Sequence, residues 1–91
     1  MITLIEIFET TSDITERKFS LKTIIINPQH IVYMSSDEKM KRFQDDGFLP
    51  KDMVAFHEFT NILFNTGRTL TVVGSLKEIE MKIAKQNLLL G

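Results

Sequence analysis

The sequence predicts an α+β protein, with a small antiparallel β-sheet of four or five strands in a meander and a C-terminal α-helix packed on one face. Three observations predict this fold. Segments rich in β-branched and aromatic residues recur up to residue 73, as expected of strands. A glycine-containing hairpin signal separates the last two of these segments. Residues 75–91 open with a helix-capping motif and carry an apolar stripe.

The first three strands are predicted at residues 2–8, 18–26 and 30–34. Residues 9–17 are polar and indicate a turn or loop. The second strand alternates apolar and polar residues before it closes on three isoleucines, which indicates that its end is covered. Asn27-Pro28 ends it, because proline cannot donate a ladder hydrogen bond.

Residues 35–59 form an insertion between strands. Ser35 to Glu38 can cap a short helix, and Gly47 and Pro50 break the chain after it. Long connections in compact domains are usually functional or mobile.

A fourth strand is predicted over 54–64, with a break near His57, and a fifth over 69–73. Asn65-Thr66-Gly67 joins them as a hairpin, with Gly67 suited to a positive φ. Ser75 and Glu78 then form a capping box, and the apolar stripe of the final helix consists of Leu76, Ile79 and Ile83.

Length and composition exclude several classes of protein. Ninety-one residues make a single domain, 1–91. The 11 basic and 12 acidic residues give a net charge of −1, whereas nucleic-acid-binding proteins usually carry a basic excess, so we expect no nucleic-acid partner. No apolar run approaches the roughly 20 residues of a membrane span. The absence of cysteine and of a visible signal sequence favours the cytoplasm. We also expect a homo-oligomer, because symmetric dimers are the commonest assemblies and the core of so short a chain is thin.

Two blocks of the sequence resemble the FlbD-like family of small flagellar and swarming-motility proteins. They span residues 26–31 and 60–75 and cover under half of the chain; their shared features, in order, are Asn27-Pro28, Gly67, Val72-Val73 and Ser75 with Glu78-Ile79. The first predicted strand and the insertion depart from the family pattern. The resemblance implies a small β-meander plus helix without catalytic residues or a cofactor. Because small phage or bacterial proteins share this plan, a phage-encoded regulator is one interpretation.

Catalytic and metal chemistry find little support in the residue pattern. The only histidines, His30 and His57, are far apart in the sequence, and a strand would put His57 and Glu58 on opposite faces. The acids of the insertion lack the spacing of a calcium loop, and the glycines form no phosphate-binding loop. We therefore expect no enzyme activity, no catalytic residues, no metal and no cofactor.

The insertion supplies the candidate binding residues. Aromatic and methionine side chains are enriched at recognition surfaces, and basic residues beside them suit an acidic partner or an anionic ligand. The alternative is that they fold back as a lid over the small core. The candidates are Phe43, Phe48, Leu49, Met53, Phe56, Phe59, Lys39 and Arg42.

Two functional hypotheses follow. The first is a non-enzymatic regulatory or adaptor protein that binds a protein partner through the insertion or through an exposed sheet edge. The second is an oligomeric protein that binds or sequesters a small, nucleotide-like anion.

Overall fold

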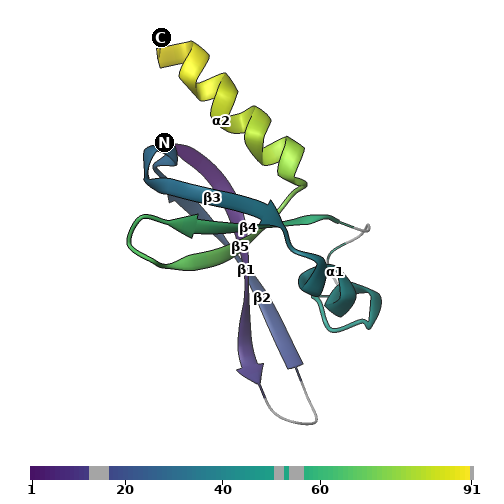
Figure 1. Cartoon of the computed structure of the whole chain (residues 1–91). Helices are drawn as coiled ribbons and strands as arrows, with labels where there is room; N and C mark the ends of the chain where they lie inside the picture. The colour runs from purple at the N-terminus through teal and green to yellow at the C-terminus, as the bar shows by residue number, and fades with distance from the viewer. Residues whose placement is uncertain (13–16, 51–52, 54–56, 91) are drawn as a thin grey trace.

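The fold was analysed in a computed structural model that describes residues 1–12, 17–50, 53 and 57–90. It contains five strands, two α-helices and a 3-10 turn (Figure 1). In chain order these are β1 (Ile2–Ser12), β2 (Arg17–Ile26), η1 (Pro28–His30), β3 (Ile31–Ser36), α1 (Glu38–Asp45), β4 (Phe59–Phe64), β5 (Thr69–Val73) and α2 (Leu76–Leu90). Within the described ranges, neither helix has the length and apolar character needed to cross a membrane.

The strands form one antiparallel sheet in the order β2-β1-β5-β4-β3, which confirms the predicted fold class. The meander runs through β3, β4 and β5, and β5 then pairs with β1. The hairpin β1–β2 is longer than expected, because residues 9–12 pair with residues 17–19 rather than forming a loop. The predicted loop at residues 9–12 was wrong, because this end of the hairpin lies largely in solvent, where polar residues can form a strand without an apolar face.

A very short connection forces the sheet to coil. Strands β2 and β3 are its two edges, and only residues 27–30 join them. Five strands in a flat sheet would separate the edges by about 19 Å. The link from Ile26 to Ile31 could reach about 18 Å only if fully extended, and it contains a 3-10 turn capped by Asn27. The edges must therefore curl toward each other, and Ile26 and Ile31 pack in the same cluster.

The hairpin between β4 and β5 forms at the predicted position. The amide of Phe64 donates to Arg68 O at 2.9 Å, and the amide of Gly67 donates to Phe64 O at the same distance. Gly67 adopts a φ of 88°, a region that glycine enters without steric cost. The turn thus needs glycine where the sequence has it.

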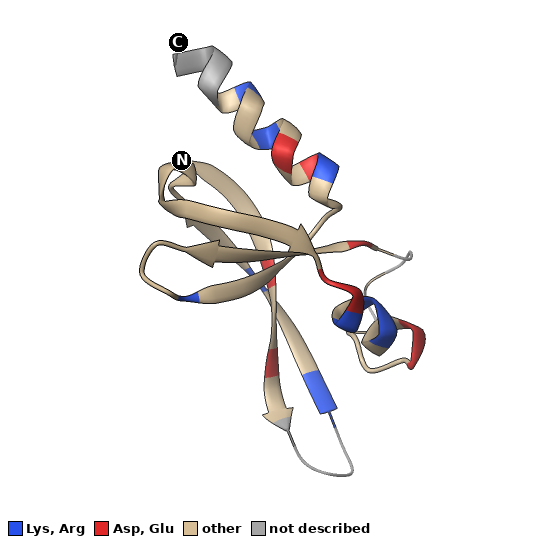
Figure 2. Cartoon of the chain, viewed as in Figure 1, with Lys and Arg blue, Asp and Glu red and all other residues tan. Residues whose placement is uncertain are grey.

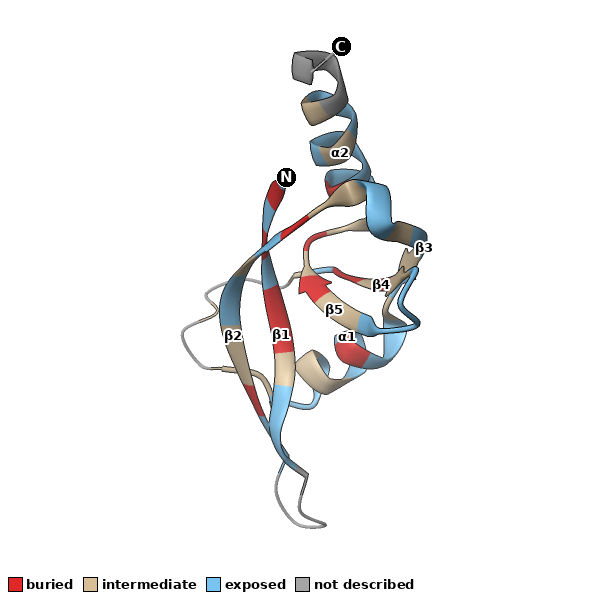
Figure 3. Ribbon diagram, turned by 90° about the vertical axis from the view of Figure 1, so that its left-hand side faces the viewer, coloured by how far each residue is buried: buried red, intermediate tan, exposed pale blue. Residues whose placement is uncertain are grey.

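Strand alternation places two hydrophobic clusters on opposite faces of the sheet. Buried residues recur along the strands and in both helices (Figure 3). Residues alternate between the faces along each strand, so Leu4 belongs to one cluster and Ile7 to the other. The first cluster comprises Ile2, Leu4, Ile26, Ile62, Val72 and Ile79. The second comprises Ile7, Phe19, Met40 and Phe59.

Helix α2 covers the first cluster with its N-terminal part. The Glu78 amide donates to the Ser75 hydroxyl at 3.1 Å, which is one half of the predicted capping box. Ile79 is 1% exposed and Ile83 packs beside it, whereas Met81 on the other side of the helix lies in solvent. The helix then continues beyond the sheet (Figure 1). The predicted stripe therefore meets the sheet through Ile79 and Ile83.

Candidate functional site

The candidate binding residues lie mainly on the second face of the sheet. Lys39, Arg42 and Phe43 belong to α1, whereas Phe59 lies within β4. Leu49 and Met53 are partly buried in the second cluster, and Phe56 lies outside the described residues.

Burial separates these residues into a packed group and an accessible group. Phe59 is 2% exposed, so it stabilises the sheet and has almost no surface left for a partner. Phe48 is 39% exposed and contacts the Phe43 ring edge-on at 6.2 Å between centroids. Lys39 and Arg42 are exposed on α1. The described part of the insertion thus covers the sheet with its apolar side chains and presents its charged ones.

A cleft opens beside α1, where β1 and β5 separate. The two strands pair only at Glu6 with Val72 and at Ile7 with Thr71. Beyond these pairs the strands diverge and border a cavity of about 370 Å³. The cavity is lined by residues 6–9 of β1, Arg17 and Phe19 of β2, Asp37, residues of α1 that include Lys39 and Phe43, Asn61 of β4 and residues 69–71 of β5.

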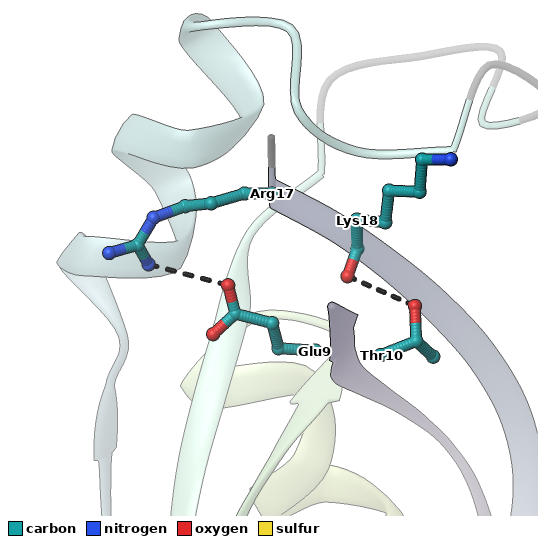
Figure 4. A network of polar contacts seen from close by, with 4 residues as sticks. All are labelled: Glu9, Thr10, Arg17 and Lys18. Carbon is teal, nitrogen blue, oxygen red and sulfur yellow. Dashed lines mark hydrogen bonds and ion pairs between the residues drawn. The ribbon is translucent and has the colours of Figure 1, made fainter. Parts of the chain in front are cut away.

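Two cations converge on the ring of Phe43 in this cleft. The guanidinium carbon of Arg17 lies 4.7 Å from the ring centroid, and Lys39 Nζ lies 5.7 Å from it. Arg17 also pairs with Glu9 at 3.5 Å across the β1–β2 hairpin (Figure 4). Next to this pair, the Thr10 hydroxyl donates to Lys18 O at 3.2 Å (Figure 4). The end of the β1–β2 hairpin, which the sequence predicted to be a loop, therefore places the Arg17 guanidinium in the cleft.

Asp37 fixes the position of α1 against the sheet. Its Oδ1 accepts the Met40 amide at 2.9 Å, as an N-cap residue does, and its Oδ2 accepts the Thr71 hydroxyl at 2.8 Å. Gln44, at the other end of α1, exchanges two 2.9 Å hydrogen bonds with the backbone of His57. These contacts hold both ends of the helix beside the cleft.

The free edge of β3 is a second surface that sequence reasoning did not resolve. Ile31 faces Phe64 and Tyr33 faces Leu63, so β3 has one extra residue, Val32, in a β-bulge. Val32 is 63% exposed and Tyr33 61% exposed. Regular alternation would place consecutive residues on opposite faces of the sheet, and the bulge interrupts this alternation at Val32.

Sequence reasoning also missed Arg17, Glu9, Asn61 and Thr71 as cleft residues. They belong to four strands, β1, β2, β4 and β5, and no local motif joins them. Within the described part of the chain, no three His, Asp or Glu side chains gather as metal ligands would.

No family model, curated protein or solved structure matches this chain. The resemblance to the FlbD-like family stays a prediction from the two sequence blocks.

Proposed function

We propose that the protein is a non-enzymatic regulatory or adaptor module that binds a protein partner at the free edge of β3. The observation that carries the proposal is the bulge at Val32, which turns Val32 and Tyr33 toward solvent together. Bulges re-aim side chains at sheet edges and are built features of a fold. Tyrosine is enriched at protein–protein interfaces, and Tyr33 lies exposed on this edge strand.

The two edges of the sheet differ in charge, which favours β3 as the binding edge. Strand β2 carries Arg17, Lys18 and Lys22, and charged side chains on an edge strand oppose pairing with another chain. Strand β3 has the sequence Ile-Val-Tyr-Met-Ser-Ser and no charge (Figure 2). The edge of β3 therefore suits an extended, uncharged partner segment that adds a strand to the sheet.

In-cell photo-cross-linking tests this proposal. Tyr33 is replaced by p-benzoylphenylalanine in the full chain, and the same replacement at Met81, which is equally exposed on α2, serves as the control. We expect a discrete cross-linked product from position 33 and none of that mass from position 81. The Val32→Lys variant should lose the product, because a lysine on the edge opposes strand addition.

The mass of the product identifies the partner class. A product that contains a second protein supports an adaptor, and one of twice the mass of the chain assigns the edge to a second copy, in accord with the expected homo-oligomer. Equal cross-linking from positions 33 and 81, or no product from position 33, would contradict the proposal.

The alternative function is the binding of a small anion, and it is supported by the cations beside Phe43.

A further inference from the structure

The cleft between β1, β5 and α1 has the dimensions of a small-molecule site. Its volume is about 370 Å³, and pockets for small ligands range from about 300 to 1,000 Å³. The cleft exists because β1–β5 pairing stops at Ile7 and Thr71. It is separate from the outer edge of β3, so the protein-binding proposal does not use it.

The cations in the cleft are placed for an oxyanion. Arg17 and Lys39 both lie beside the Phe43 ring and both line the cleft. Arg17 is only loosely neutralised by Glu9, at 3.5 Å with both side chains partly in solvent. Lys39 forms no ion pair with another described residue. The oxygens of a phosphate can accept hydrogen bonds from the planar guanidinium and from the ammonium.

The rest of the lining suits the organic part of such a ligand. Glu6, Glu9 and Asp37 supply carboxylate acceptors, and Asn61 and Thr69 supply an amide and a hydroxyl. Three carboxylates in the lining disfavour a polyphosphate and favour a ligand that also offers hydrogen-bond donors. The Phe43 ring is already covered by Phe19 and the two cations, so recognition relies on polar contacts rather than on stacking.

We propose that this cleft binds the phosphate of a small organic phosphate the size of a nucleoside monophosphate. Arg17 and Lys39 would hold the phosphate, and Glu9 and Asn61 would contact the hydroxyl or amino groups of the organic part.

NMR titration of the full-length ¹⁵N-labelled chain tests the proposal with three probes: AMP, glucose 6-phosphate and inorganic phosphate. We expect saturable shifts at Lys39 and residues 69–71 with at least one organic phosphate. That ligand should bind about ten-fold or more tightly than inorganic phosphate. Lys39→Ala should weaken its binding by about ten-fold or more, because a hydrogen bond to a charged group contributes about 1.5–3 kcal/mol.

Lys41→Ala is the matched control, because Lys41 has the same charge on the same helix but does not line the cleft. Its affinity should equal that of the wild type. Four results would each overturn the proposal: no saturable shift, unchanged affinity in Lys39→Ala, an equal loss in Lys41→Ala, or inorganic phosphate binding as tightly as both organic probes.

Discussion

The hydroxyl of Thr71 on β5 donates a 2.8 Å hydrogen bond to Asp37, the residue that caps α1. The second oxygen of the same carboxylate accepts the Met40 amide at 2.9 Å. One side chain therefore starts the helix and also anchors it to the sheet. Because α1 contributes Lys39 and Phe43 to the cleft, this pair sets where those side chains lie.

Asp37→Ala should lower the free energy of unfolding by about 2–3 kcal/mol, because it removes the helix cap and the hydrogen bond to Thr71. Thr71→Val should cost about 1 kcal/mol, and Thr71→Ser should be close to wild type because it keeps the hydroxyl. Urea unfolding measures all three. In a double-mutant cycle, Asp37→Ala and Thr71→Val should couple by at least about 0.5 kcal/mol; strictly additive losses would show that the bond does not stabilise the fold.

Two features of the turn from β5 into α2 require glycine at position 74. The backbone of Gly74 has a φ of 129°, and a Cβ added there would lie only 3.1 Å from Ile79 Cδ1. Gly67 has a φ of 88°, but a Cβ there would meet no atom within 4 Å. Gly67→Ala should therefore cost about 1–2 kcal/mol of backbone strain, whereas Gly74→Ala should cost more because the buried Ile79 must also move.

Ile79→Val isolates the steric part of this effect, since it removes the Cδ1 atom that the new methyl group would contact. The double variant should lose less stability than the sum of the two single variants, by at least about 0.5 kcal/mol. Thermal unfolding followed by circular dichroism can measure the difference. If the losses simply add, backbone strain alone accounts for the need for glycine.

The two groups of candidate residues in the insertion should respond differently to truncation. Phe59→Ala should destabilise the protein by about 3–5 kcal/mol, as large-to-small changes in a core do. Phe48→Ala, at a ring that is 39% exposed, should cost about 1 kcal/mol, the scale of one aromatic pair. Chemical denaturation of both variants makes the comparison. Similar losses would mean that Phe48 packs as deeply as Phe59.

Much of the local structure followed from the sequence. The Asn-Thr-Gly hairpin formed where it was predicted, because Gly67 tolerates a φ that other residues avoid. The start of α2 was predicted because Ser75 can satisfy a free amide of its first turn. The ends of β1 and β2 were missed, since their polar residues resemble a loop in sequence and become strand only through pairing across the hairpin.

The cleft was largely hidden from the sequence. Lys39 and Phe43 were candidates because basic residues surround the aromatic cluster of the insertion, but Arg17, Glu9 and Thr71 joined them only through the sheet order. No spacing rule brings together residues from the first hairpin and the fifth strand. The outward turn of both Val32 and Tyr33 likewise arises from a mismatch in register with β4.

The sequence by itself determined the β4–β5 hairpin, the start of α2 and the approximate positions of the strands, because alternation, glycine and helix capping act over a few neighbouring residues. Only the tertiary structure decided that the sheet coils, that β1 and β5 separate after two residue pairs, and that two cations reach one aromatic ring. Those features depend on long-range strand pairing and on a connection too short to span a flat sheet. Such constraints belong to the whole chain and to no single segment of it.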